Sequence, residues 1–426
     1  MTSSDLAVPL TDAHGVTAER VGPKAATLAQ LKRAGLPVPD GVCLTADVYR
    51  HHLERAGMTD AARQIASLDP FQARRVGVRI KVALTTVALA DDVARTIEAA
   101  RTHLVRDAQL AVRSSALSEN TAPASFAGQF ETFLGISEAE DLTTAVRACW
   151  MSVWSTRALR YMRAYDIDPA TSAMSVLMQR MVAADASGGA FSLTPDDQIV
   201  LTGTWGLGTA IAQGDVVPDR YVLRRDASVE LVEPGRKDHL VTAAATGTRS
   251  RAVSRERAEA PCLAENEATT LGQLVLAAES ALGAPVEIEW AKDAHGFWIV
   301  QARPLHLEQR AEVDEVWRHH PAMTGQPAGI GWGTGRACIV SEERDLDRVP
   351  VGSIIVTEVG GPALSAVLPR AAGVIAELGG STSHLAALAR ERGIPAVLGV
   401  RGATRRIPEG AMVAVDGITG IVRWMR

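Results

Sequence analysis

The spacing of apolar residues predicts both helices and strands in the first 305 residues. Apolar side chains recur every three or four positions from Val146 to Tyr165, which predicts one long helix. Gln30 to Ala34 form the last part of another predicted helix, which ends at Gly35. The two prolines of the following LPVPDGVCLT favour a turn and a strand there. Val286 to Trp290 and Phe297 to Gln301 predict a hairpin around the turn AKDAHG.

Two changes in this pattern divide the chain. From Ser187 to Trp205 the sequence changes from helix-like to glycine- and threonine-rich strand, which predicts two subdomains that meet near residue 190. From His306 to Gly325 it is polar and charged without a strand pattern, which predicts a linker. Fully stretched, that linker spans up to roughly 70 Å. We therefore expect a first domain over residues 1–305, a linker over 306–325 and a second domain over 326–426.

Short apolar strands follow the predicted linker. They cover Ser353–Thr357, Gly373–Glu377, Ala396–Val400 and Met412–Val415, and they predict a compact α/β domain of about 100 residues. The fold class expected for the whole chain is thus α/β (α+β). No apolar run approaches the ~18 residues of a membrane span, and the start MTSSDLAVPLTDAHG lacks the basic and apolar regions of a secretory leader. A cytoplasmic protein with no membrane partner is the expectation.

Composition narrows the expected partners. The 426 residues are 47% hydrophobic and 22% charged, which is typical of globular proteins, and they are too many for one typical core. The net charge of -5 and the scattered Lys and Arg residues give no support for nucleic-acid binding, so we expect a small molecule or a protein as partner. The four cysteines lie far apart without a CxxC pair. We expect them to be reduced and partly buried rather than to bind zinc or form disulfides.

Two cationic residues suit the phosphates of a nucleoside triphosphate. Lys24 follows a tight Gly22-Pro23 turn and opens a helix, where backbone N–H groups also meet phosphate; a solvated lysine at a helix start is the alternative. Arg113 closes a strand in LAVRSSALSE and is followed by a loop from Ser125 to Gly128, so a planar phosphate-binding group is combined with small residues. The alternative for this stretch is a hairpin with a surface arginine.

Amide and acidic residues later in the chain suit adenine and a metal ion. Gln179 ends a strand before a glycine-rich turn and can bond an adenine edge, although a glutamine at a strand end is also ordinary polar surface. In VEIEWAKDAHGFWIVQARPL, period-two alternation places Glu287, Glu289, Gln301 and Arg303 on one sheet face. Oxygen ligands beside a guanidinium suit Mg²⁺ with a triphosphate, and a cross-strand salt bridge is the alternative.

Residues 20–305 resemble the ATP-grasp nucleotide-binding domain of the pyruvate phosphate dikinase, phosphoenolpyruvate synthase and rifampicin phosphotransferase family. The motifs that carry this resemblance are GPKAATL, GLPVPDG, VRSSALSE, ASFAGQFETFLG, CWMSVWSTRALRY, GLGTAIAQGDVVPD and IEWAKDAHGFWIVQARPL. The resemblance implies that ATP and Mg²⁺ are bound. It implies that Lys24 and Arg113 contact phosphates, that Gly128, Thr132 and Phe133 line the nucleotide pocket, that Gln179 faces adenine, and that Glu289, Gln301 and Arg303 hold Mg²⁺ and the β- and γ-phosphates, with Glu289 and Gln301 as metal ligands.

Three residues depart from the family pattern. Pro23 replaces a common glycine, Asn120 stands where the family usually has Asp, and Thr209 follows GLG where Glu is usual. Pro23 stiffens the loop beside Lys24, and the other two changes remove carboxylates. Reduced turnover or altered use of the metal is therefore a hypothesis.

A single histidine stands out in LGGSTSHLAALARERGIPAVLGV. The Gly379-Gly380 turn, a cap among Ser381 to Ser383 and a stop at Gly393 and Pro395 predict a helix with His384 in its first turn. The positive end of a helix disfavours imidazolium, so the neutral and nucleophilic ring is present near neutral pH. After phosphorylation, the same helix end stabilises the new negative charge. A histidine that merely caps or packs is the alternative.

Residues from about Gly325 to Val422 resemble the swivelling phosphohistidine domain of the same family, through AAGVIAELGG, the Gly-Gly turn before His384, ARERGIPAV and VAVDGITG. The resemblance implies that ATP pyrophosphorylates His384, that phosphate is then lost, and that the remaining phosphoryl group passes to an acceptor with AMP as the other product.

Family members usually carry a third, acceptor-binding domain, and we find no sequence for one between the two halves or after them. We expect a phosphotransferase whose acceptor is a small molecule, bound between the domains or on a separate subunit, in specialised metabolism or antibiotic resistance. A phosphocarrier that regulates a partner protein is one alternative. An ATP-binding pseudoenzyme is another, because of Pro23, Asn120 and Thr209.

Overall fold

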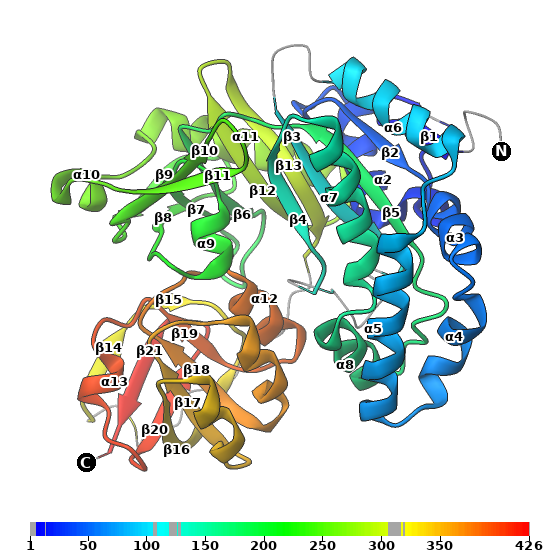
Figure 1. Ribbon diagram of the computed structural model, residues 1–426. Coiled ribbons are helices and arrows are strands. Elements are labelled where there is room, and N and C mark those ends of the chain that lie inside the picture. The colour runs from blue at the N-terminus through cyan, green and yellow to red at the C-terminus, as the bar shows by residue number, and fades with distance from the viewer. Residues whose placement is uncertain are drawn as a thin grey trace. The chain divides into compact units, whose positions relative to one another are not determined.

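The computed structural model describes residues 6–12, 14–104, 109–118, 126, 129–305, 317 and 320–425. Helices and strands both occur along the whole chain, in runs such as α3 to α6 and β8 to β11 (Figure 1). The α-helices are α2 (Ala18–Arg33), α3 (Ala46–Arg55), α4 (Thr59–Gln64), α5 (Pro70–Thr86), α6 (Asp91–Leu104), α7 (Ala139–Ser152), α8 (Thr156–Ala164), α9 (Thr209–Gln213), α10 (Arg255–Glu259), α11 (Glu265–Leu282), α12 (His384–Glu391) and α13 (Ala403–Arg406). Short 3₁₀ helices are η1 (Ile65–Ser67), η3 (Glu343–Arg348), η4 (Pro362–Ala366) and η5 (Leu368–Arg370).

The strands belong to several sheets. They are β1 (Ala7–Pro9), β2 (Gly41–Leu44), β3 (Leu110–Ala116), β4 (Thr132–Ile136), β5 (Met174–Arg180), β6 (Ala186–Phe191), β7 (Ile199–Trp205), β8 (Asp219–Leu223), β9 (Val229–Glu233), β10 (His239–Ala243), β11 (Thr248–Ala252), β12 (Val286–Asp293), β13 (Gly296–Pro304), β14 (Ala322–Thr324), β15 (Gln326–Pro327), β16 (Trp332–Val340), β17 (Ser353–Thr357), β18 (Ala371–Ala376), β19 (Ala396–Leu398), β20 (Met412–Asp416) and β21 (Ile421–Trp424).

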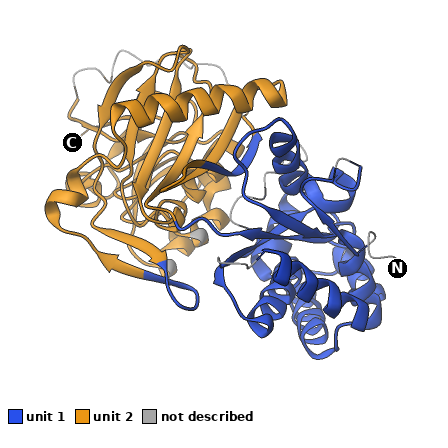
Figure 2. Ribbon diagram, turned by 90° about the horizontal axis from the view of Figure 1, so that it is seen from above, with its two compact units in different colours: residues 1–183, 243–249, 298–303 blue, residues 184–242, 250–297, 304–426 orange. Residues whose placement is uncertain are grey.

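The chain forms two compact units, which Figure 2 colours separately. Unit 1 comprises residues 1–183, 243–249 and 298–303, and unit 2 comprises residues 184–242, 250–297 and 304–426. The chain passes between the units more than once. These units are defined by how compactly their residues pack and not by domain limits. The domain limits expected from the sequence, at residues 305 and 325, therefore stay a prediction.

Unit 1 is built on an antiparallel sheet with strand order β1-β2-β5-β3-β4. All seven residues of β3 are buried, because α2 and α7 pack against this strand and β5. The long helix predicted from Val146 to Tyr165 is wrong: the chain breaks it between α7 and α8. Ser155 caps α8 by accepting a hydrogen bond from the Ala158 N–H at 3.1 Å. Trp154 lies between the two helices and is buried. The apolar spacing therefore continues through a stretch in which the helix is interrupted.

Unit 2 begins with antiparallel strands in the order β12-β6-β7-β8-β9. Strands β6 and β7 confirm the predicted change to strand structure from Ser187 to Trp205. The predicted hairpin is also confirmed, since β12 and β13 follow each other as neighbouring strands. Helix α11 packs on β12, β7, β8 and β9.

A buried ion pair lies beside this sheet. The side chains of Asp219 and Lys237 are both completely buried and bonded to each other. Asp219 also accepts hydrogen bonds from the backbone N–H groups of Gly235 and Cys262, each at 2.7 Å. Each oxygen of the carboxylate therefore has a backbone donor in addition to the ammonium group.

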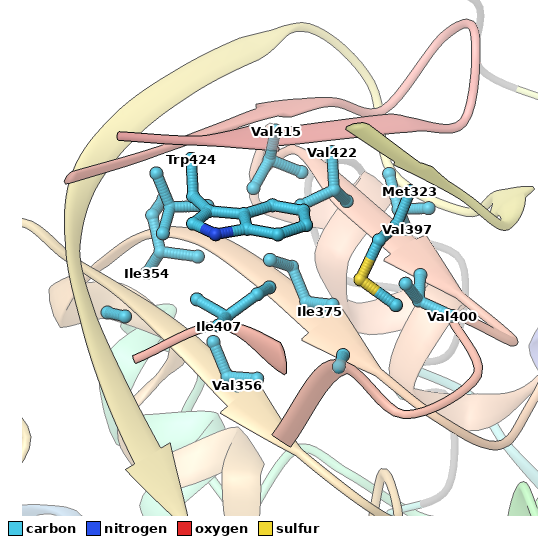
Figure 3. Close-up of a cluster of buried hydrophobic side chains, with 13 residues drawn as sticks. Met323, Ile354, Val356, Ile375, Val397, Val400, Ile407, Val415, Val422 and Trp424 are labelled. Atoms are coloured by element: carbon cyan, nitrogen blue, oxygen red, sulfur yellow. The ribbon is translucent and has the colours of Figure 1, made fainter. Parts of the chain in front are cut away.

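The second sheet of unit 2 is mixed, with strand order β14-β21-β20-β16-β17-β18-β19-β15. Strands β16, β17, β18 and β19 run parallel, and the others join them antiparallel. Apolar side chains from most of these strands form one core (Figure 3). The Trp424 ring, 4% exposed, extends into this core with Val415 and Val422 on one side and Ile407 on the other.

The strands predicted after the linker are confirmed with adjusted ends. Strand β17 has the predicted bounds, whereas β19 ends at Leu398 rather than Val400, because Gly399 adopts a φ of 73° that a strand does not tolerate. The end of the predicted linker is not free of strand structure. Strand β14 lies within residues 306–325 and pairs with β21 through Met323 opposite Val422. The short β14 alternates exposed and buried residues, and one buried methionine gives little apolar signal.

The four cysteines are free thiols and are all buried, more deeply than the sequence led us to expect. Cys43 and Cys149 belong to unit 1, and Cys262 and Cys338 belong to unit 2. In the part of the chain that the structure describes, no helix is both long and apolar enough to cross a membrane.

Candidate active site

Lys24 occupies the start of a helical segment, as predicted. Helix α2 is kinked at Gly22, where φ is 75°, and the segment after the kink begins with Pro23 and Lys24. A Cβ on Gly22 would lie 2.5 Å from the Ser115 Oγ, so only glycine fits this turn. Lys24 is 9% exposed, and its Nζ donates a hydrogen bond to the Ser114 carbonyl at 3.0 Å. The ammonium group therefore lies against β3.

Arg113 lies in the middle of β3, not at the strand end that the sequence suggested. Its guanidinium donates from Nη1 to the Val300 carbonyl at 2.7 Å and from Nη2 to the Gln301 Oε1 at 2.8 Å. Arg113 is 9% exposed, so this arginine is not a surface residue. Lys24 bonds to Ser114, the next residue along the strand. Within unit 1 the structure thus places the Arg113 guanidinium against Gln301 and the Lys24 ammonium group against the backbone of the next β3 residue.

The other predicted nucleotide residues of unit 1 lie on the same sheet or on β13. Thr132, exposed, is opposite Arg113 in the β3–β4 pair, and Phe133, half-buried, is opposite Val112. Arg303 is half-buried on β13. Gly128 lies outside the described residues, as does the family departure Asn120.

Gln179 is almost completely buried in unit 1, with 1% of its surface exposed. The side chain of this β5 residue donates from Nε2 to the Pro39 carbonyl at 3.3 Å. That bond fixes the amide on the sheet. Its predicted role beside adenine stays a prediction.

The predicted metal ligands fall in different units, Glu289 in unit 2 and Gln301 in unit 1. Glu289 is exposed on β12, where it shares a face with Glu287, and Ile288 between them is buried. Among the described residues, no three His, Cys, Asp or Glu side chains gather into a metal-binding group. Magnesium commonly uses one or two carboxylates together with phosphate oxygens, and a carboxylate and an amide oxygen are donors of the kind it takes. The assignment of Glu289 and Gln301 stays a prediction.

His384 is the first residue of α12 in unit 2, as the sequence predicts. The sequence left three candidates for the cap, and the structure selects Ser383, whose Oγ accepts a hydrogen bond from the Ala386 N–H at 3.3 Å. The helix ends before Gly393, which has a φ of 61°. The residues after His384, Leu385 to Ala389, are buried, whereas His384 itself is half-buried. Packing of that apolar face fixes the backbone while the imidazole keeps access to solvent.

The loop before His384 is held by residues that sequence reasoning did not assign. The Gly379 N–H donates to the Val216 carbonyl at 3.1 Å, and the Thr382 hydroxyl bonds the Thr202 hydroxyl at 2.8 Å. Glu377 accepts hydrogen bonds from Gly402 and Thr404. Burial alone would raise the pKa of Glu377, but the bonds from Thr404 and Gly402 outweigh it and lower that pKa below its usual value. Glu377 thus stays ionised and anchors the loop.

Arg390 is another residue that the sequence analysis missed. From α12 it donates to the Ala328 carbonyl at 3.2 Å and to both carboxylate oxygens of Glu287 at 3.3 Å. Its guanidinium also lies over the Phe191 ring, 4.7 Å from the centroid. The only local signal was the charged end ARER of an otherwise apolar helix, which names no partner.

Two family models match the chain. The pyruvate phosphate dikinase AMP/ATP-binding domain matches residues 18–322, and the mobile domain of PEP-utilising enzymes matches residues 349–420. The chain belongs to the pyruvate phosphate dikinase AMP/ATP-binding domain family. Its α/β fold, with an ATP-grasp nucleotide-binding domain followed by a phosphohistidine-type domain, is as expected from the sequence. For this family member, Lys24, Arg113 and Gln301 fall in the first match and His384 in the second.

The pyruvate phosphate dikinase family member resembles curated phosphoenolpyruvate synthases. It is 32% identical over 416 residues to a probable phosphoenolpyruvate synthase of Methanothermobacter thermautotrophicus, covering 94% of this chain and 61% of that protein. It is 31% identical over 457 residues to the phosphoenolpyruvate synthase of Aeropyrum pernix, covering 94% and 56%. With the Escherichia coli phosphoenolpyruvate synthase, identity is 31% over 441 residues, covering 95% and 56%. The chain therefore spans between 56% and 61% of the length of these relatives.

Proposed function

We propose that this chain is an ATP-dependent phosphotransferase that works through a phosphohistidine on His384. The observation that carries the proposal is the placement of His384, a half-buried residue that opens α12 in the mobile-domain match. The same chain carries two buried cationic residues, Lys24 and Arg113, in the AMP/ATP-binding match. A nucleophile that stores a phosphoryl group and cationic residues that bind phosphates are the two parts that a dikinase needs.

The residues divide the transfer into steps. Lys24 and Arg113 bind the phosphates of ATP, and Gln301 orients the Arg113 guanidinium. A neutral imidazole nitrogen of His384 attacks the β-phosphorus, AMP leaves, and water then removes the terminal phosphate. The remaining phosphoryl group passes to the acceptor, so that ATP, water and acceptor give AMP, phosphate and phosphorylated acceptor. Mg²⁺, for which Glu289 and Gln301 are the proposed ligands, supplies charge stabilisation on the phosphate oxygens.

The acceptor in this proposal is a small molecule, bound by this chain or by a separate acceptor-binding subunit. The relatives are named phosphoenolpyruvate synthases, and the chain spans at most 61% of their length. A role in specialised metabolism or antibiotic resistance is part of the same proposal. Candidate metabolites can be tested by incubation with ATP and detection of AMP and phosphorylated product by mass spectrometry.

Labelled ATP tests the proposed chemistry. We expect protein incubated with Mg²⁺ and [β-³²P]ATP to retain covalent label that is lost in acid and kept in base, as a phosphoramidate is. With [γ-³²P]ATP, the label is expected to appear mainly as free phosphate, because the terminal phosphate leaves. AMP should form in the same amount as the covalent label. Retention of the γ-phosphate as the lasting label, or formation of ADP, would contradict the dikinase sequence.

Replacement of Arg113 by lysine tests the proposed binding of phosphate by this residue. One ammonium group cannot donate to the Val300 carbonyl, the Gln301 amide and a phosphate in the planar geometry of a guanidinium. We expect Arg113→Lys to weaken ATP binding by about 10- to 100-fold, since a charge-assisted hydrogen bond contributes ~1.5–3 kcal/mol. Isothermal titration calorimetry measures the Kd. Arg79→Lys, on the exposed face of α5, is the matched control and should bind ATP as wild type does.

A further inference from the structure

A cavity of about 130 Å³ lies within unit 2, and the function proposed above does not use it. One wall is a sheet face formed by Phe191 of β6, Val200 of β7 and Arg220 of β8. The opposite wall is formed by Pro327 of β15, by Ser381 in the loop before α12 and by Arg390 of α12. Residues more than a hundred positions apart in the sequence therefore line a single space.

The body of the cavity is apolar. Phe191 and Val200 are opposite each other in the β6–β7 pair and belong to one apolar cluster with Val222, against which Leu305 packs. Pro327 of β15 lines the other side. A dry apolar cavity of about 150 Å³ holds a molecule the size of benzene, so a single ring or a short branched chain fits this volume.

A buried hydroxyl lines the same cavity. Ser381 is 4% exposed, and among the described residues its Oγ has no hydrogen-bond partner. A buried hydroxyl without a partner is unfavourable, because it has given up its hydrogen bonds to water. The cavity therefore contains a polar group that a ligand atom can satisfy.

The charges at the cavity favour an anion. Arg220 bonds Glu233 at 2.7 Å, but the Glu233 side chain is 50% exposed, and such surface pairs contribute little. A ligand carboxylate can replace Glu233 at low cost. Arg390 is different, because its partner Glu287 is only 12% exposed and already neutralises it. Asp196, also among the lining residues, is exposed at the rim. Arg220 is thus the cation that a ligand can use.

We propose that this cavity binds a small, mainly apolar carboxylic acid of about the size of one aromatic ring. Its apolar body lies against Phe191 and Val200, and its carboxylate accepts hydrogen bonds from Arg220 and Ser381. Because the two walls come from residues 191–220 and from residues 327–418, the bound acid contacts both and stabilises the loop that precedes His384. The proposal concerns binding alone and does not depend on phosphoryl transfer.

Benzoate is the probe for this site. We expect one saturable benzoate site per chain by isothermal titration calorimetry, and binding of the neutral isostere benzamide at least about tenfold weaker, because the charge-assisted bond is lost. Arg220→Gln should weaken benzoate binding by about tenfold or more and leave benzamide binding unchanged. Arg224→Gln is the matched control, since this arginine of the same region pairs with Glu230 outside the cavity. Absence of saturable benzoate binding, or equal binding by Arg220→Gln and Arg224→Gln, would overturn the proposal.

A second measurement covers the case in which Arg220→Gln fails to fold. Ser381→Ala removes only the buried hydroxyl and should also weaken benzoate binding. At benzoate concentrations ten times the Kd, amide hydrogens of the segment from Leu378 to Glu391 should exchange up to about tenfold more slowly in the wild type. The His384→Asn protein should bind benzoate as the wild type does, so failure of the phosphohistidine chemistry leaves this result intact. Unchanged exchange in that segment, with benzoate bound, would contradict the position of the site.

Discussion

His384→Asn protein is expected to take up no covalent phosphoryl group from ATP and to form no AMP. Asparagine keeps a polar side chain at the start of α12, and Ser383 still caps the helix, so the fold is retained. The variant lacks the imidazole nitrogen that the proposed first step requires. Loss of a covalent nucleophile removes the whole pathway, so the rate should fall by a factor on the order of 10³ or more. Scintillation counting of the ³²P-labelled protein and chromatography of AMP measure both effects.

His103 supplies the matched control for this experiment. It is an exposed residue of α6 in unit 1, far along the chain from the mobile-domain match. His103→Asn should retain wild-type labelling and AMP formation, and both variants should unfold at the same temperature as the wild type. Label that persists in His384→Asn would place the phosphorylated residue elsewhere. Equal loss in both variants would point to damage of the fold rather than of the nucleophile.

Lys237→Met is expected to destabilise unit 2 strongly, because it breaks the buried ion pair with Asp219. The change leaves the Asp219 carboxylate completely buried without its cationic partner, although the bonds from Gly235 and Cys262 remain. Breaking a buried pair by removing one partner costs about 3–5 kcal/mol. We expect the urea midpoint for unfolding of unit 2 to fall accordingly.

The double variant Asp219→Asn/Lys237→Met separates two contributions to the loss of stability: the lost attraction between the two charges, and the cost of a buried charge without a partner. Without the carboxylate, no ion stays buried, so the double variant should be more stable than Lys237→Met alone. Arg224→Gln, which breaks an exposed pair with Glu230, should change the free energy of unfolding by less than about 1 kcal/mol. Equal stability of Lys237→Met and Arg224→Gln would contradict the role given to burial.

Local signals made the region around His384 predictable. A capping serine before an apolar run and a glycine after it mark both helix ends, because each acts on backbone groups within one turn. The strand that now forms β17 was equally clear, since all five of its residues are buried and its three central residues, Ile354 to Val356, are apolar and β-branched. The sequence thus predicted where the helix around His384 and the strand β17 begin and end.

Other features depend on contacts between distant residues, which spacing does not encode. The break between α7 and α8 was missed because Trp150 and Trp154 are both buried. Buried positions are apolar whether or not the helix continues, so their spacing in the sequence does not show the break. Arg113 was recognised as a phosphate-binding candidate, but its bonds to Val300 and Gln301 join positions almost two hundred residues apart. The pairing of Glu287 with Arg390 was missed for the same reason.

The burial of all four cysteines makes the thiols internal reporters of opening. Burial raises the pKa of Cys43 to about 12 and also raises the pKa of Cys149, Cys262 and Cys338, so the reactive thiolate is scarce in the folded protein. An alkylating reagent therefore modifies a cysteine only when the surrounding structure opens. Each unit contains two cysteines. Mass spectrometry of the modified peptides can therefore measure the rate at which unit 1 and unit 2 each open, in one sample and without any introduced probe.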